Sequence, residues 1–298
     1  MKTIPKPIIL SVLASVFCLF VLGHHGLTKD AKKVGPEQQQ LDAVRNRAIR
    51  FLKLSQAKDG TWTAPNVPGI TALSVAALLQ SGVSKDDPVV AQGLKFLESL
   101  KQKTGGIYHP QTLHRNYETS ISLLAFSAAN DEGKYTETIK DAEKFLRGLQ
   151  WDEGEGLESD DEAFGGAGYG KHQRPDLSNT QFLLDALKAA GVKAEDPAMQ
   201  KARRFVSRCQ NLETSHNNTK FAAKIQDGGF YYPPAAGGTS QAGLSANGGL
   251  RSYGSMTYAG LKSMIFAGVK MDDPRAKAAL KWIQKNYSLN LNPGMGKQ

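Results

Sequence analysis

The chain has 298 residues, of which 40% are hydrophobic, and a formal net charge of +9. Such a chain can bury one large core or two modest ones, which excludes disorder as its general state. The positive residues are spread mostly along predicted helices without a nucleic-acid recognition motif, so we expect no nucleic-acid partner. The charge is compatible with peripheral contact with an anionic membrane surface.

The N-terminus carries the pattern of a targeting segment. Lys2 and Lys6 precede an apolar run from Ile8 to Leu22, which has the length of a signal-peptide core and is short for a membrane span. We predict a signal peptide over residues 1–23, with cleavage after Gly23 and export to the periplasm or the exterior. An uncleaved N-terminal membrane anchor is the alternative.

Cleavage at this position changes the cysteine content of the chain. It removes Cys18 and leaves Cys209 as the one cysteine of the mature protein, which excludes an internal disulfide. The predicted organisation is a signal peptide (1–23), a linker (24–40), a repeat domain (41–288) and a C-terminal tail (289–298).

Four segments of the repeat domain share one pattern. Each begins at a threonine, with larger apolar residues four and seven positions later and small residues six and ten positions later. Each ends at a glycine or an asparagine, the residues that tolerate the left-handed conformation at a helix end. The threonines are Thr71, Thr119, Thr180 and Thr257. This spacing predicts four helices with an apolar stripe.

Predicted helices of a second type lie between these segments and are amphipathic and rich in charge. Their apolar anchors are Phe51-Leu52, Phe96-Leu97, Phe145-Leu146, Phe205-Val206 and Trp282-Ile283. The alternation of the two types predicts an all-α fold in which helical hairpins form a ring, an α/α toroid with about five outer and four inner helices. Loops lengthen around 152–168, 211–228 and 233–251, and long loops at one end are where function would be built.

A glycine-aromatic turn follows each of the first four outer helices. The turns are "DGTW" at Asp59–Trp62, "GGIY" at Gly105–Tyr108, "GGAGY" at Gly165–Tyr169 and "DGGFYY" at Asp227–Tyr232. In the first copy, Phe51-Leu52, Gln56, Gly60 and Trp62 have the spacing of a glutamine-tryptophan repeat. Over residues 41–288 the chain therefore resembles the terpenoid cyclase (squalene and hopene cyclase) and protein prenyltransferase toroid superfamily.

The resemblance implies that the motif holds helix ends together. The second copy has Lys101 where the first has Gln56, and the fourth has Gln210 with a long insertion before its glycines. The rings of the family have five or six full hairpins, so the ring predicted here can be incomplete.

The chemistries of the family depend on residues that this sequence carries only in part. Hopene-forming cyclases protonate an alkene with an Asp-x-Asp-Asp run, and the nearest segment here, "ESDD" at Glu158–Asp161, begins with glutamate and lies in a loop that we predict to be solvated. Protein prenyltransferases hold zinc with Asp-x-Cys and a distant histidine, whereas Cys209 follows Ser207-Arg208. We predict no metal and no cofactor.

Polar and aromatic residues gather at the starts of the predicted inner helices, which in a toroid converge on one mouth of the central cavity. Glu118 is the candidate catalytic residue, because a carboxyl group can act as a general acid if desolvation raises its pKa. Aromatic faces can stabilise a cationic intermediate or a bound apolar chain. The ligand-cavity candidates are Tyr117, Asp176, Asn179, Gln181, Arg251, Tyr253 and Tyr258. The alternative is a purely structural ring, since Ser178 or Asn179 and Ser255 are suited to cap helices.

Three functions stay open. The first is an exported cyclase-like or prenyltransferase-like enzyme that acts on an isoprenoid. The second is a binding or scaffold toroid that holds a lipid, another apolar small molecule or a partner without chemistry. The third is a carbohydrate-active α/α barrel, which needs paired carboxylates, and only Glu118 and Asp176 qualify. The sequence does not decide whether the protein is an enzyme, and it identifies no protein partner.

Overall fold

The structure, a computed structural model, describes residues 36–170 and 173–296. The chain divides into two units between Asn46 and Arg47. Helix α1 (Gln38–Ser55) crosses this boundary in the sequence, and the other described helices belong to the second unit. The predicted signal peptide and most of the predicted linker lie outside the described residues.

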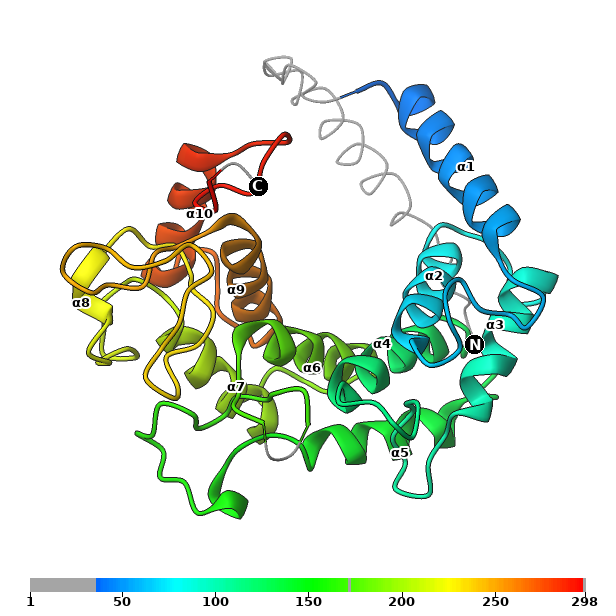
Figure 1. Cartoon of the computed structure of the whole chain (residues 1–298), viewed down its shortest axis with the longest axis horizontal. Coiled ribbons are helices and arrows are strands. Elements are labelled where there is room, and N and C mark those ends of the chain that lie inside the picture. Colours follow the sequence, from blue (N-terminus) through cyan, green and yellow to red (C-terminus); the bar gives the residue numbers. More distant parts are fainter. Residues whose placement is uncertain (1–35, 171–172, 297–298) are drawn as a thin grey trace, which may run out of the picture. The chain divides into compact units, whose positions relative to one another are not determined.

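The described helices of the second unit form an inner and an outer row (Figure 1). The inner row is α2 (Pro68–Gln80), α4 (Arg115–Ala128), α6 (Leu177–Ala189) and α9 (Gly254–Phe266), and the outer row is α3 (Pro88–Ser99), α5 (Thr136–Arg147), α7 (Pro197–Arg208) and α10 (Pro274–Asn286). Consecutive inner helices pack against one another, and each packs against the outer helix that follows it. The 3-10 helix η1 (Glu153–Glu155) and the short α8 (Ala222–Ile225) lie in the long loops.

This arrangement confirms the predicted all-α fold. Strand pairing in the described residues is limited to isolated bridges. Packing in the second unit runs from α2 to α9, and no comparable packing joins the described residues of α9 back to α2, so the inner row does not close on itself within this unit. Among the residues that the structure describes, no helix is long and apolar enough to cross a bilayer.

The core lies between the two rows. The large residues predicted for the apolar stripe point into it: Val75, Leu78, Leu123, Phe126, Leu184, Leu187 and Met264 are fully buried, and Leu261 is partly buried. The alignment on the threonines therefore identified the core-facing side of each inner helix.

The repeated threonines have the same structural role in all four copies. Each is fully buried, and its hydroxyl oxygen accepts a hydrogen bond from a backbone N–H of the preceding glycine-aromatic turn. The bonds run from Trp62 to Thr71 (3.3 Å), Ile107 to Thr119 (3.0 Å), Ala167 to Thr180 (3.0 Å) and Phe230 to Thr257 (3.1 Å). A buried N–H without a partner is costly, so the threonine fixes each turn to its inner helix.

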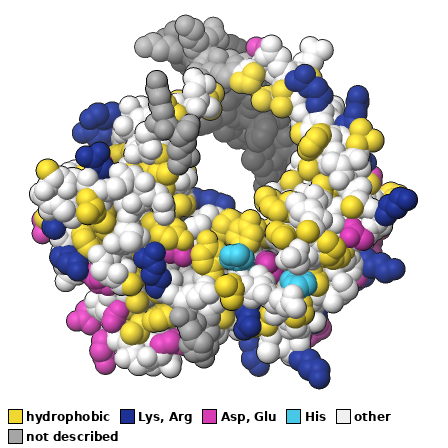
Figure 2. Space-filling view, viewed as in Figure 1, with side chains coloured by type: hydrophobic (Ala, Val, Ile, Leu, Met, Phe, Trp, Pro, Cys, Tyr) yellow, Lys and Arg dark blue, Asp and Glu magenta, His cyan; other side chains and the backbone are white. Residues whose placement is uncertain are grey.

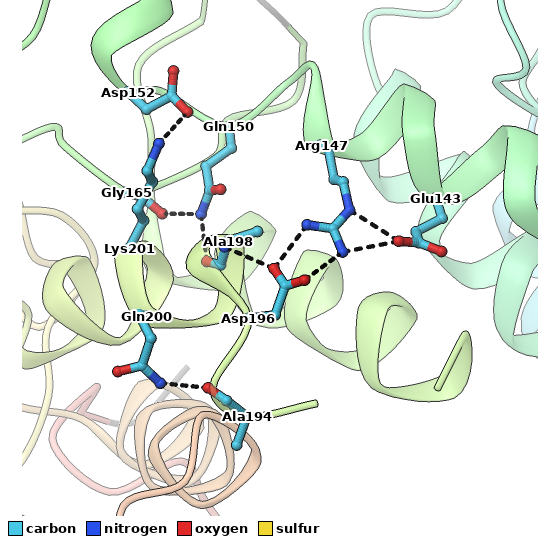
Figure 3. A network of polar contacts seen from close by, with 10 residues as sticks. All are labelled: Glu143, Arg147, Gln150, Asp152, Gly165, Ala194, Asp196, Ala198, Gln200 and Lys201. Atoms are coloured by element: carbon cyan, nitrogen blue, oxygen red, sulfur yellow. Dashed lines mark hydrogen bonds and ion pairs between the residues drawn. The ribbon is translucent and has the colours of Figure 1, made fainter. Parts of the chain in front are cut away.

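Glutamine side chains join three of the turns to the next outer helix. Nε2 of Gln150 donates to the carbonyl oxygens of Gly165 and Ala198, each at 2.9 Å (Figure 3). The same pairs of bonds join Gln56 to Gly60 and Val89, and Gln210 to Gly228 and Arg275. In the second copy Lys101 instead forms an ion pair with Asp141 at 2.9 Å. The structural role that the resemblance implied for the motif is thus confirmed.

The turns also require glycine where they meet the next outer helix. Gly165 has a φ of +87°, and a Cβ on it would overlap the carbonyl oxygen of Lys201 on α7. Glycine supplies both the left-handed backbone and the close approach.

Three outer helices begin with aspartate followed by proline, a combination that favours a helix start. The carboxylate of each aspartate accepts the backbone N–H two residues later, and each also pairs with a basic side chain. The pairs are Asp87 with Lys53, Asp196 with Arg147 and Asp273 with Arg275.

Candidate site on the inner helices

The start of α6 is organised around the buried Asp176. Its carboxylate accepts hydrogen bonds from the backbone N–H and the side-chain amide of Asn179, both at 2.8 Å, and a further one from Tyr232. Burial raises the pKa of Asp176, and these hydrogen bonds act in the opposite direction. Asp176 is therefore the cap of α6, and the expectation that Ser178 or Asn179 caps this helix was wrong, because the chain enters the helix two or three residues earlier.

Asn116 connects α4 to α6. Its side-chain amide donates to the carbonyl oxygens of Gly168 at 2.9 Å and of Asn179 at 3.2 Å, and its own oxygen accepts from Ser120 at 3.0 Å. Oδ1 of the buried Asn179 has no hydrogen-bond partner among the described residues. The polar residues between these two helices thus bind mainly to one another.

Glu118 is buried in the first turn of α4, and both of its oxygens have partners. Oε2 accepts from the backbone N–H of His109 at 3.0 Å, and Oε1 accepts from the hydroxyl of Thr112 at 2.7 Å. Burial raises the pKa of Glu118, whereas the two hydrogen bonds lower it. The carboxyl group holds residues 109–112 against the helix.

Tyr117 is half-buried between two other inner helices. Its ring meets Phe182 of α6 edge-on, with centroids 4.9 Å apart. On the other side it packs so closely on α2 that a Cβ on Gly69 would overlap it. Tyr117 therefore contributes to the packing of α2, α4 and α6.

The predicted residues around α9 differ in exposure. Tyr253 is buried just before the helix, its backbone N–H donates to the carbonyl of Phe230 at 3.1 Å, and burial raises the pKa of its hydroxyl. Tyr258, in the helix, is 43% exposed. Arg251 is exposed, and its carbonyl oxygen accepts a hydrogen bond from Ser240.

Ser255 does not cap α9, contrary to expectation. It lies inside the first turn, where its backbone N–H donates to Oδ1 of Asn292 at 2.9 Å. The backbone N–H of Gly254 donates to the carbonyl of Pro293 at 2.8 Å. The C-terminal segment caps the helix, and a local pattern cannot reveal a partner 37 residues away.

An ion pair links α6 to α9. Nζ of Lys262 lies 2.7 Å from Oδ2 of Asp185, which also accepts a hydrogen bond from Gln181. Asp185 is 6% exposed, and its Oδ1 has no partner among the described residues. Burial raises its pKa against the effect of Lys262. This pair was not predicted from the sequence, although Asp185 and Lys262 each follow a repeat threonine, Thr180 and Thr257, by five positions.

The exposed positions of α2 and α9 include large apolar residues. Ile70 and Leu73 are 37% and 48% exposed, and Tyr258 and Ile265 are 43% exposed each. Spacings of three and seven residues place each pair on one side of its helix. Figure 2 shows hydrophobic side chains along the concave side of the arc that the described helices of the second unit form. These four residues are called the inner apolar face below.

A family model identifies the chain. The model of the squalene-hopene cyclase C-terminal domain matches residues 63–233, more than half of the 298 residues. The chain belongs to this family. The hydrogen bonds of the repeat threonine and glutamine continue to α9 and α10, so the cyclase-like repeat extends beyond the matched residues. No curated protein matches the chain in sequence.

The candidate reactive side chains of this cyclase-like toroid differ in how deeply they are buried. Glu158–Asp161 lies mainly exposed in its loop, as predicted. Cys209 is fully buried, and burial raises the pKa of its thiol well above the ordinary value, which makes it a poor nucleophile. In the described ranges, no group of three or more His, Cys, Asp or Glu side chains could hold a metal ion. The buried carboxyl groups of the described cyclase-like toroid are Glu118, Asp176 and Asp185, all at inner helices.

The structure brings together some of the predicted cavity residues and separates others. Asp176 contacts Asn179, and Gln181 contacts the unpredicted Asp185. Within the described residues, no hydrogen bond joins the side chains of Glu118, Tyr117, Arg251 and Tyr258 to one another.

Proposed function

We propose that this cyclase-like toroid is exported and binds an isoprenoid or another apolar chain on its inner apolar face. The observation that carries the proposal is the exposure of Ile70, Leu73, Tyr258 and Ile265 on α2 and α9. Most exposed positions of the outer helices α5 and α7 are charged or polar. The two pairs lie on the first and the last helix of the inner row, and exposed apolar residues on each of these helices indicate an interaction site.

The energy available from this surface follows from how much of each side chain is exposed. A large apolar or aromatic side chain contributes roughly 1.5–3 kcal/mol when it goes from fully exposed to fully buried. Because the four residues are 37–48% exposed, a bound chain that covers all of them gains about 3–5 kcal/mol, and a millimolar complex corresponds to about 4 kcal/mol. Tyr258 adds an aromatic face, which suits the alkene units of an isoprenoid or a cationic group.

A catalytic step would use Glu118 as its acid, because burial raises the pKa of this carboxyl group. Both oxygens accept hydrogen bonds from residues 109–112, so proton donation requires one of these bonds to open. A carbohydrate-active pair would require hydrogen bonds to open at both Glu118 and Asp176, because neighbouring donors engage each carboxyl group.

The test is calorimetric titration of the folded protein with a solubilised polyprene. We expect saturable binding by the parent and a loss of affinity of roughly three- to tenfold in Tyr258→Ala, because this side chain is 43% exposed before the ligand binds. Tyr287→Ala is the matched control, because Tyr287 is also exposed but follows the outer helix α10. Absence of binding by the parent, or an equal loss in both variants, contradicts the proposal.

Mass analysis of the incubated lipid separates an enzyme from a binding protein. Glu118→Gln preserves the shape of the side chain and removes the acid. A catalytic role predicts that this variant binds the polyprene and forms no product, whereas the parent converts it. A purely binding function predicts that neither protein changes the lipid.

Export has its own test. N-terminal sequencing of the protein recovered outside the cytoplasm is expected to begin at His24, after cleavage behind Gly23. A chain that keeps its first residues and fractionates with membranes would support the anchor alternative.

A further inference from the structure

A cavity of about 650 Å³ lies over the outward side of α7, and no residue of an inner helix lines it. Residues of α7 form its floor, segments of the loops at 153–164 and 215–218 form its sides, and α10 contributes one residue. Both segments belong to the long loops in which function was expected from the sequence. The basic lining residues are Lys201, Arg203, Arg204, Arg208, His216 and Arg275, and the acidic ones are Glu153 and Asp160.

Carboxylates neutralise two of these basic groups. Lys201 pairs with Asp152 at 2.8 Å (Figure 3) and also with Glu153. Arg275 forms a forked pair with Asp273, in which Nη2 lies 2.8 Å from Oδ2. Neither group contributes a full uncompensated charge to the cavity.

Three arginines of α7, two of them adjacent and the third one turn later, form no ion pair within the described residues. Arg208 is buried and donates to the carbonyl oxygens of Ser159 and Asp161. Arg204 donates to the same carbonyl of Ser159 at 2.8 Å. The guanidinium of Arg203 forms no hydrogen bond with any described residue. A guanidinium carries five N–H donors, so most donors of these three side chains remain available.

The charges around the cavity repel one another. Burial lowers the pKa of Arg208, and the neighbouring Arg204 lowers it further. Burial and then Arg275 lower the pKa of Arg203. Burial lowers the pKa of His216, Arg275, Arg203 and Arg204 lower it further, and Asp273 acts in the opposite direction. An anion in the cavity would offset this repulsion.

We infer that this cavity binds a phosphate or sulfate group carried by a soluble small molecule, with Arg203, Arg204 and Arg208 as its ligands. Guanidinium forks match the geometry of tetrahedral oxyanions and supply charge-assisted hydrogen bonds. The cavity has room for more than one oxyanion, and the buried ring of Phe164 packs against Lys201 and Arg204.

The first test is calorimetric titration of the full chain with inorganic phosphate at constant ionic strength. The parent is expected to show saturable binding at one site, and Arg203→Gln to bind about tenfold more weakly or worse, as expected for loss of a charge-assisted hydrogen bond. The variant should fold normally, because the side chain of Arg203 forms no hydrogen bond or ion pair with described residues.

Arg50→Gln is the matched control, because Arg50 is an exposed arginine of α1 with no ion pair in the described part of the chain. It should bind phosphate as the parent does. Equal losses in both variants would mean that only net charge matters, and full binding by Arg203→Gln or none by the parent would also overturn the inference.

The second test uses His216 as a reporter. An anion beside this imidazole favours its protonated form, so addition of sulfate is expected to raise the pKa of His216 in an NMR titration and to leave that of His109 unchanged. An unchanged pKa of His216 contradicts the site. Glycerol 3-phosphate is expected to compete with inorganic phosphate, and binding restricted to vesicles containing phosphatidic acid would contradict a soluble ligand.

Discussion

The carboxyl groups of the outer helices and those of the inner helices have opposite pKa shifts. The capping aspartates of three outer helices have lowered pKa values, each chiefly through a hydrogen bond from a basic side chain, and that of Asp273 falls to about 2. The buried carboxyl groups at the inner helices have raised pKa values, each chiefly through burial. The outer carboxylates stabilise the fold in their charged form, whereas the inner ones are held in places that disfavour the charge.

The two groups give stability an opposite pH dependence. The outer aspartates, with folded pKa values below the ordinary 3.8, stabilise above that value and lose their contribution as pH falls through the folded pKa. The inner carboxyl groups bind protons more tightly in the folded state, so stability declines as pH rises from their ordinary values through the raised pKa. At neutral pH the outer aspartates therefore contribute to stability in their charged form, whereas ionisation of the inner carboxyl groups costs stability.

The largest expected effect comes from breaking the contact of a turn with the outer row. Gly165→Ala forces a side chain into the backbone of α7 at a φ of +87°, and we expect a loss of about 3 kcal/mol or more in urea unfolding. Gly191→Ala is the control, because Gly191 has a φ of +89° and open space where a Cβ would lie, so only the backbone cost of about 1–2 kcal/mol remains. Equal losses of stability in the two variants would mean that the close approach of Gly165 to the backbone of α7 does not contribute.

The next largest effect is expected at the glutamine of the repeat, where Gln150 can be compared with Lys101, the residue at the same position in the second copy. Gln150→Ala leaves two buried carbonyl oxygens without their donor, for which we expect a loss of about 2–3 kcal/mol. Lys101→Ala removes a partly exposed ion pair with Asp141, for which we expect about 1 kcal/mol or less. A larger loss in Lys101→Ala would contradict the assignment of the glutamines as structural ties.

A smaller effect is expected at an outer carboxylate. Asp196→Asn keeps a capping oxygen but removes the charge that pairs with Arg147, at a cost of about 1 kcal/mol at neutral pH. Since the folded pKa of Asp196 lies below 3.8, the difference from the parent should shrink as pH falls below that value. Urea unfolding at a series of pH values measures the difference in unfolding free energy between the variant and the parent. A difference that does not change with pH would contradict the lowered pKa of Asp196.

The smallest effect is expected at an inner carboxyl group. Asp185→Asn removes a buried charge, while Lys262, whose side chain is 48% exposed, can be solvated by water. We expect a stability change within about 1 kcal/mol at neutral pH, in the stabilising direction, and a weaker decline of stability as pH rises above 3.8. A clear destabilisation would show that the pair with Lys262 outweighs the cost of burial.

Local, repeated features made the fold predictable from the sequence. Each repeat threonine binds the glycine-aromatic turn that precedes its inner helix, and Gln56 and Gln210 bind carbonyl oxygens of outer helices. Because these residues recur at regular positions, their spacing was enough to predict the alternation of inner and outer helices. The burial of the apolar stripe was also predictable, because its residues lie at fixed positions after each threonine.

The missed residues act across long distances in the chain. Asp185 pairs with Lys262, which lies 77 residues later in the chain, and the backbone N–H of Ser255 donates to Asn292, which lies 37 residues later. Arg203 belongs to a charged outer helix, and such charges are normally solvated; only the loops that fold over α7 enclose it in a cavity. Tertiary packing brings the residues of these sites together, and a periodic pattern in the sequence does not predict such long-range contacts.

The most direct test of the central claim is photo-crosslinking with a polyprene that carries a photoreactive group, followed by mass-spectrometric mapping of the modified residues. We expect label on the peptides of α2 and α9 that contain Ile70, Leu73, Tyr258 and Ile265, and competition by unlabelled polyprene. Label concentrated on the outer helices, or spread evenly over exposed apolar residues such as Leu113 and Leu244, would contradict a binding site on the inner apolar face.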